Sequence, residues 1–191
     1  MQINLIREAK AMKYYLVALF DDESYKNLNP IQKNLSKRFR ANRNSPTPYI
    51  PLEIIENPNI DKLDVVIDKI VKPYKNFKVQ LSTEVSVSET NKTLNMKILD
   101  VGYIKRLNRL MSDTLKLHGF NIQNYNSELS MHISLANLNY IPKDMKKFDG
   151  EVNFKSNCET LKVDRIEIWK VSNNKRETLI KSYPLKKNLY L

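Results

Sequence analysis

A histidine and a serine lie two residues apart in the apolar segment Met131–Leu135. Successive side chains of a β-strand point to opposite faces, so His132 and Ser134 are predicted to share one face of a strand. An imidazole transfers protons near neutral pH, and a hydroxyl beside it can hydrogen-bond to an anionic oxygen, so the pair suits phosphate chemistry. Taken alone, the segment is also compatible with a buried histidine that hydrogen-bonds to a backbone carbonyl.

A second segment of the same pattern lies 83 residues earlier (132 minus 49), over residues 48–54. In this alignment Tyr49 takes the position of His132, and Pro51 takes that of Ser134. Its apolar residues alternate as they do in the later segment, and each segment follows an amphipathic stretch and a polar loop. The sequence therefore indicates a diverged duplication.

The two segments and the strand-like run Tyr14–Phe20 resemble the two-histidine phosphoesterases, a superfamily of 2'-5' RNA ligase-like proteins and cyclic phosphodiesterases. Its members carry two His-x-Thr/Ser motifs, one in each lobe, that face each other across a cleft holding a phosphodiester or a 2',3'-cyclic phosphate. The resemblance covers about residues 13–171. It implies that His132 and Ser134 form the second motif, whereas the first motif reads Tyr49-Ile50-Pro51.

A complete site of this kind uses one imidazole as a base and the other as an acid. Tyr49 is a poor base at pH 7 because a phenol has a pKa of about 10, and Pro51 has neither a hydroxyl nor an N–H. The first hypothesis is a protein that binds an RNA end, a nucleotide or a cyclic phosphate, with catalysis weakened or lost. The second is an active phosphodiesterase on 2',3'-cyclic phosphates or 2'-5' linkages, in which Tyr49 is the acid and His132 the base. The third is a structural or partner-binding protein with a vestigial cleft.

Aromatic residues are candidates for stacking on a nucleobase. We expect Tyr140 and Tyr15 to contact the substrate, and Trp169 is predicted to point away from Ile166 and Ile168 on the same strand. The alternative for each is a place in the core. His118, the second histidine of the chain, is predicted to lie at a helix end, because Gly119 follows it.

Composition limits the partners. The 191-residue chain has a formal net charge of +11, which favours RNA or a nucleotide phosphate as the partner, although lysines spread along a chain also serve solubility. Charged residues near the motifs, such as Arg43, are expected to be solvated. One cysteine and no Cys-His cluster predict no disulfide and no metal, and three glycines argue against a phosphate-binding glycine loop. We expect a cytoplasmic monomer without a cofactor or a membrane anchor.

The pattern of apolar residues predicts an α+β fold with two pseudo-symmetric lobes, each an antiparallel sheet backed by helices, around a central cleft. Residues 13–184 are expected to form one bilobal domain, preceded by an appendage over 1–12 and followed by a tail over 185–191. Glu53 is predicted to share the face of Tyr49 and Pro51 by simple alternation. Helices are expected at 22–40, 60–72 and 103–118, and strands at 14–20, 49–54, 77–87, 93–99, 131–135, 152–154, 161–171 and 178–183.

Overall fold

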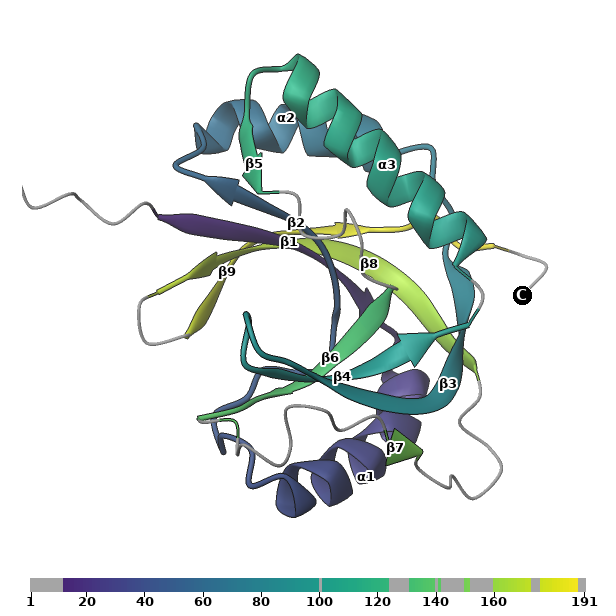
Figure 1. The fold of residues 1–191 in the computed structure, drawn as a ribbon. Coiled ribbons are helices and arrows are strands. Elements are labelled where there is room, and N and C mark those ends of the chain that lie inside the picture. Colours follow the sequence, from purple (N-terminus) through teal and green to yellow (C-terminus); the bar gives the residue numbers. More distant parts are fainter. Residues whose placement is uncertain are drawn as a thin grey trace, which may run out of the picture.

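The computed structural model describes residues 12–99, 101–123, 131–139, 141, 150–151, 160–172 and 176–188. Its strands form one strongly curled antiparallel sheet with the order β5-β2-β1-β8-β3-β4-β6, to which β7 adds beside β3 and β9 beside β8. Helices cover the outer, convex side of this sheet, and its inner, concave side faces away from them (Figure 1). The α+β fold class is confirmed.

The first lobe contains β1 (Lys13–Phe20), β2 (Ile50–Glu56), β5 (Asn121–Gln123), β8 (Thr160–Val171) and β9 (Glu177–Pro184). The second lobe contains β4 (Thr93–Ile98), β6 (His132–Asn137) and β7 (Gly150–Glu151). The long strand β3 (Phe77–Ser88) joins the lobes, because its first residues pair with β8 and its later residues pair with β4. The two lobes are therefore built from one continuous sheet.

Each lobe is covered by helices. Helices α2 (Ile60–Val71) and α3 (Gly102–Leu117) lie over the first lobe, and α1 (Asp22–Arg38) lies over the second (Figure 1). The helix that follows the first strand of one lobe thus crosses to cover the other lobe. This exchange ties the lobes together, because α1 packs against β6 of the second lobe and α3 packs against β2 of the first.

Local sequence sets the helix ends. Asp21 caps α1 by accepting a hydrogen bond from the backbone N–H of Ser24 at 2.9 Å. Helix α3 ends at Gly119, which has a φ of 77° and follows the C-cap residue His118. Helix α1 ends with the same backbone pattern, but Arg40 occupies the corresponding position with a φ of 49°.

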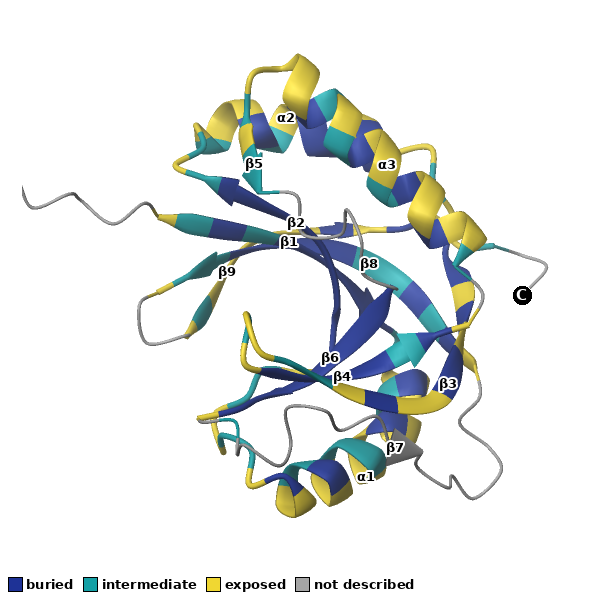
Figure 2. Cartoon of the chain, in the orientation of Figure 1, coloured by how far each residue is buried: buried dark blue, intermediate teal, exposed yellow. Residues whose placement is uncertain are grey.

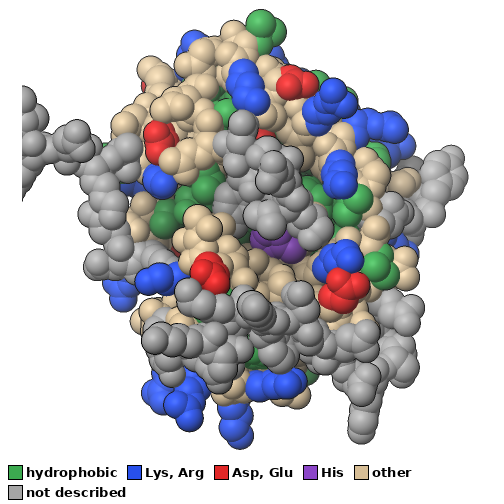
Figure 3. Space-filling view, in the orientation of Figure 1, with side chains coloured by type: hydrophobic (Ala, Val, Ile, Leu, Met, Phe, Trp, Pro, Cys, Tyr) green, Lys and Arg blue, Asp and Glu red, His purple; other side chains and the backbone are tan. Residues whose placement is uncertain are grey.

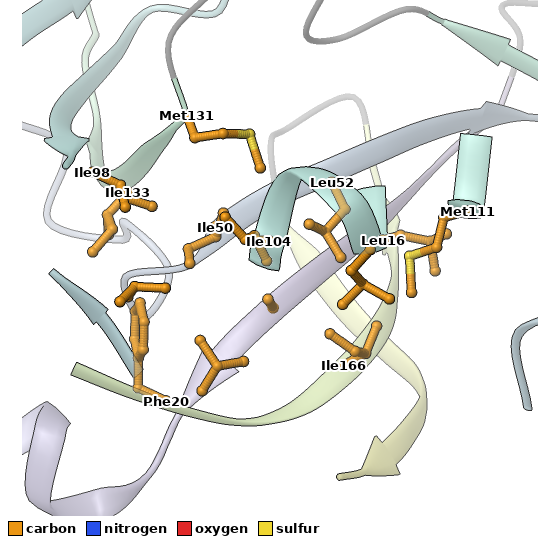
Figure 4. Close-up of a cluster of buried hydrophobic side chains, with 14 of the residues drawn as sticks. Leu16, Phe20, Ile50, Leu52, Ile98, Ile104, Met111, Met131, Ile133 and Ile166 are labelled. Atoms are coloured by element: carbon orange, nitrogen blue, oxygen red, sulfur yellow. The ribbon is translucent and has the colours of Figure 1, made fainter. Parts of the chain in front are cut away.

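One hydrophobic core lies between the sheet and its helices. The apolar side chains of β1 and β2 that face outward, such as Leu16 and Leu52, pack with Met111 and Ile104 of α3, as Figure 4 shows. Burial is nearly complete along β1, β2, β4 and β6, whereas most of β9 and the outer faces of the helices are exposed (Figure 2). Burial of each large apolar side chain contributes about 1.5–3 kcal/mol to the free energy of unfolding. This core therefore stabilises the curved form of the sheet.

Most predicted elements are present. The hairpin over residues 77–98, the three helices and the strands at 160–171 and 177–184 are confirmed. Residues 121–123, predicted as a loop, form the short edge strand β5 on β2. The predicted strand over 152–154 lies outside the described residues. Leu185 is buried, and the N–H of Lys186 donates to the carbonyl of Tyr74, so packing extends past Pro184.

Candidate functional site

The two motif strands meet at one residue pair. The backbone N–H of Tyr49 donates to the carbonyl of Ser134 at 3.2 Å, and the N–H of Ser134 donates to the carbonyl of Tyr49 at 2.8 Å. Two residues that exchange both hydrogen bonds lie directly opposite each other, with side chains on the same face. The first position of one motif therefore lies beside the third position of the other.

That face is the inner one, turned away from the helices. Tyr49 belongs to a small apolar cluster of inner-face residues, separate from the main core. His132 lies two residues before Ser134 on β6 and shares its face. Both are buried, with 7% of His132 and 2% of Ser134 exposed. In Figure 3 a histidine side chain is visible at the centre of the hollowed face.

Both motif strands carry a β-bulge at the same motif position. Along β1, Leu16 pairs with Glu53 and Val17 with Pro51, so Leu52 is skipped. Along β4, Leu94 pairs with Ala136 and Asn95 with Ser134, so Leu135 is skipped. Leu52 and Leu135 each lie three residues after the first motif position, and this correspondence supports the predicted duplication.

The bulge at Leu52 corrects the predicted position of Glu53. Because Leu52 is skipped in the pairing, the alternation of side chains between the two faces of β2 shifts by one residue after it. Glu53 therefore points outward beneath α3 rather than inward beside Tyr49. It is 4% exposed and hydrogen-bonds to Ser112 of α3. Burial raises the pKa of Glu53 from 4.5 to about 7, and the hydrogen bond from Ser112 and the charge of Lys116 only partly oppose this shift. Glu53 therefore cannot replace a lost catalytic group in the cleft.

The inner faces of the two lobes differ position by position. Where the second lobe pairs Asn95 with Ser134, the first lobe pairs Val17 with Pro51. Thr93, two residues before Asn95 in β4, pairs with Asn137. The equivalent pair in the first lobe is Tyr15 with Ile54. The polar pairs of one lobe thus have apolar or aromatic counterparts in the other. The difference between the lobes extends beyond the motif triplets.

The first lobe contributes an aromatic wall. The rings of Tyr49 and Trp169 pack edge to face, with centroids 5.0 Å apart. The indole N–H of Trp169 donates to Oε2 of Glu167 at 2.6 Å, and Nε of Arg165 donates to Oε1 of the same carboxylate at 3.0 Å. Trp169 is 6% exposed because Tyr49 covers it. This chain of contacts fixes the position of the Tyr49 ring.

The second lobe contributes a polar wall. Oγ1 of Thr93 and Oδ1 of Asn95 are buried without a hydrogen-bond partner among the described residues. Buried polar atoms of this kind normally bind water or a ligand. Thr93 and Asn137 line a cavity of about 50 Å³ together with Tyr15 and Tyr49. That volume is small beside the ~300–1,000 Å³ of ordinary ligand pockets, so it accommodates a small polar group rather than a whole nucleotide.

Residues of α1 hold both motif strands in place. The hydroxyl of Tyr25 donates to the carbonyl of Pro48 at 3.0 Å, immediately before Tyr49. The side-chain amide of Gln32 donates to the carbonyl of the bulged Leu135 at 2.8 Å and to that of Pro46 at 3.3 Å. One helix thus positions both halves of the site.

Beside the second motif, Lys97 of β4 lies opposite His132 in the strand pair. Its ammonium group forms a 2.8 Å ion pair with Glu84.

The structure brings four of the five predicted site residues to the inner face. Tyr15 lines the cavity beside Tyr49, and burial, with a smaller effect of Glu177, raises the pKa of the Tyr15 phenol. His132 and Ser134 lie on the opposite wall. Tyr140 lies outside the described residues. His118 lies at the end of α3, as predicted.

Sequence reasoning missed the polar partners of the second motif. Thr93, Asn95 and Lys97 alternate with apolar residues in the sequence of β4, and this pattern could have identified them as one polar face. The pair of Arg165 and Glu167 was also missed. The pairing of β4 with β6 was not visible without the register of distant strands, whereas the two-residue spacing of Arg165 and Glu167 could have placed them on one face.

Two further features concern ligands and membranes. Within the described ranges, no group of three or more His, Cys, Asp or Glu side chains is arranged to bind a metal ion. No helix in the same ranges is both long enough and apolar enough to cross a membrane.

Comparison with solved structures identifies the fold. The crystal structure of E. coli LigT complexed with 3'-AMP matches with a TM-score of 0.66 and 11% identity, over 93% of this chain and 100% of that chain. The protein TT0787 of Thermus thermophilus matches with a TM-score of 0.63 and 12% identity, and a structure described as a phosphoesterase matches with 0.62 and 10%. Both matches cover 93% of this chain and 100% of the other.

The chain therefore has the fold of LigT, a 2'-5' RNA ligase, and of the phosphoesterase structures, as the sequence resemblance predicted. Other LigT crystal structures contain phosphate, NADP+ or ATP. No protein-family model matches the sequence, and no curated protein matches it significantly. At 10–12% identity the likeness establishes the fold and not the activity.

Proposed function

We propose that the cleft binds the phosphate of a nucleotide, a 2',3'-cyclic phosphate or an RNA end, and that hydrolysis is slow or lost. The observation that carries this proposal is the polar wall of the second lobe. Thr93 and Asn95 present buried oxygens that have no hydrogen-bond partner among the described residues, and Asn95 lies opposite Ser134 in the strand pair. A ligand phosphate bears oxygens that the imidazole and the serine hydroxyl can hydrogen-bond, and its neighbouring hydroxyls can donate to the unpaired oxygens of the wall.

The one-sided wall also supports weak catalysis. A symmetric two-histidine site places a proton acceptor and a proton donor on opposite sides of the phosphorus. Here the first-lobe residues equivalent to Asn95 and Ser134 are Val17 and Pro51, which supply no side-chain hydrogen bond. Loss of one acid-base group costs about 10²- to 10⁴-fold in rate. His132 remains to exchange a proton, and the ring of Tyr49 borders the ligand.

The single tryptophan gives a direct test. Trp169 packs on Tyr49 at the cleft wall, so its fluorescence should change when a ligand enters. Titration with a 2',3'-cyclic nucleotide should give saturable binding in the wild type. His132→Ala should weaken that binding by about 10- to 100-fold, because a charge-assisted hydrogen bond contributes about 1.5–3 kcal/mol.

The second histidine supplies the matched control. His118→Ala makes the same chemical change at the exposed end of α3 and should leave the affinity unchanged. Absence of binding in the wild type, or equal loss in both variants, would contradict the proposal.

The alternative of an active phosphodiesterase rests on the Tyr49 hydroxyl. Product formation by ³¹P NMR or chromatography in the same samples measures it. Tyr49→Phe retains the ring that packs on Trp169 and removes the only group able to serve as the acid in that hypothesis. Turnover that requires both Tyr49 and His132 would favour the active enzyme. Turnover that Tyr49→Phe leaves unchanged would exclude Tyr49 as the acid.

A further inference from the structure

A second site lies outside the cleft, at the C-terminal end of α1. Here a groove of about 810 Å³ is lined by four exposed cationic residues, Lys33, Lys37, Arg40 and Arg43. None of the described lining residues is acidic, and apart from Ala41 the others are polar and uncharged. Lys and Arg side chains are visible along the lower edge of the molecule, over the region of α1 (Figure 3).

The groove and the cleft share a wall. The N–H of Asn42 donates to the carbonyl of Asn137 at 2.8 Å, and the N–H of Asn137 donates to the Ser45 hydroxyl at 2.9 Å. Asn42 and Ser45 line the groove, whereas Asn137 lines the small cavity beside Tyr49. The chain that forms the groove then continues directly into Tyr49. The groove therefore lies next to the cavity beside Tyr49, close enough for one polymer to contact both sites.

Arg40 gives independent support. It adopts a φ of 49°, at the helix-end position where α3 has Gly119. A residue with a side chain costs about 1–2 kcal/mol in this conformation, and such strain is often retained where a side chain has a function. Arg40 itself is one of the residues that line the groove.

We propose that this groove binds the sugar-phosphate backbone of single-stranded RNA whose end occupies the cleft. Cations that neutralise phosphates supply most of the sequence-independent affinity for RNA, and side-chain amides and hydroxyls position the backbone. An acidic protein partner fits less well, because the centre of a protein interface is normally apolar and this lining is not. This inference extends the proposed function. Only the placement of the RNA end in the cleft depends on that function, and the binding of the backbone in the groove does not.

The test compares two variants that lose the same charge. The groove variant carries Lys33→Gln, Lys37→Gln, Arg40→Asn and Arg43→Gln, and asparagine tolerates the backbone conformation of residue 40. The control variant carries Lys69→Gln, Lys72→Gln, Lys105→Gln and Arg109→Gln, all at exposed positions in or next to α2 and α3. Circular dichroism and thermal unfolding verify that both variants fold.

Fluorescence anisotropy of a labelled eight-nucleotide RNA is measured at several salt concentrations. The groove variant should bind the RNA at least tenfold more weakly than the wild type. The steepness of the plot of log affinity against log salt concentration should fall by about 3, because each of the four lost phosphate contacts contributes about 0.7 to the slope. The control variant should stay within about twofold of the wild type. Equal loss in both variants, or no loss in the groove variant, would overturn the inference.

Two further measurements separate this inference from the proposed function. Mononucleotide binding, followed by Trp169 fluorescence, should be unaffected in the groove variant and weakened in His132→Ala. If the wild type binds the mononucleotide and not the RNA, the groove inference fails and the proposed function stands. If it binds the RNA and not the mononucleotide, the proposed function fails. An octaglutamate peptide of the same charge serves as a competitor. If it displaces the RNA as well as unlabelled RNA does, the proposal that the groove prefers RNA is overturned.

Discussion

Tyr49 and Ser134 exchange two backbone hydrogen bonds, of 3.2 and 2.8 Å, where the ends of the curled sheet meet. In antiparallel pairing the sum of paired residue numbers is constant, so the same register would place Pro51 opposite His132. In the observed pair, the first position of one motif lies against the third position of the other. This register is the one that a two-fold duplication produces, and it determines what each substitution can change.

The first prediction restores the missing motif. The double variant Tyr49→His, Pro51→Thr places a second imidazole beside Ser134 and a hydroxyl at position 51. The rate of 2',3'-cyclic nucleotide hydrolysis should rise by about 10²- to 10⁴-fold, because a second acid-base group becomes available. The control is Tyr49→Phe, Pro51→Thr, which changes the same positions without an imidazole. Equal rates in the two double variants would show that the register alone does not create an active site.

The second prediction concerns the buried Glu53 carboxyl, whose folded-state pKa of about 7 lies above its ordinary value of 4.5. The folded state therefore binds the proton more tightly than the unfolded state does. This contribution to the free energy of unfolding is fully present below pH 4.5, is lost as pH rises towards 7, and is constant above that. The loss amounts to about 3 kcal/mol.

Glu53→Gln removes this titration while keeping the size of the side chain. Urea unfolding should show the variant more stable than the wild type at pH 7.5, with the difference shrinking towards pH 4.5. A difference that is independent of pH would contradict an elevated pKa for Glu53.

The third prediction compares the two helix ends. Arg40→Gly should raise the free energy of unfolding by about 0.5–1 kcal/mol, because glycine adopts a positive φ without steric cost. Gly119→Ala should lower it by about 1 kcal/mol through the backbone alone, since nothing lies within 4 Å of the added Cβ. Chemical unfolding measures both. Changes of the same sign in the two variants would refute the common helix-end geometry.

The fourth prediction concerns the support of the aromatic wall. Glu167→Leu leaves the indole N–H of Trp169 and the guanidinium of Arg165 without this carboxylate acceptor, and should cost about 3 kcal/mol. Glu84→Leu breaks the exposed ion pair with Lys97 and should cost under about 1 kcal/mol. Thermal unfolding compares the two variants, and Trp169 emission should shift in the first alone. Similar losses would mean that Glu167 does not organise the wall.

Local patterning determined much of this protein. Alternating apolar residues predicted the strands on either side of the cleft, and the 83-residue offset (132 minus 49) between equivalent positions predicted the duplication. The face of His132 and Ser134 followed from two-residue spacing alone. Gly119 identified the end of α3 because few other residues adopt its backbone conformation at low cost. These features depend on residues close together in the chain.

The tertiary structure decided which groups enter the cleft. Alternation predicted Glu53 beside Tyr49, but the bulge at Leu52 directs it outward, and a bulge exists only when a distant strand supplies the register. The opposition of Tyr49 to Ser134 depends likewise on the closure of a sheet whose curvature is set by the packing of all its strands and helices. The groove beside Asn42 forms only when a helix end and the end of β6 meet. Sequence fixes the period of a strand, whereas pairing between distant segments fixes its register and its neighbours.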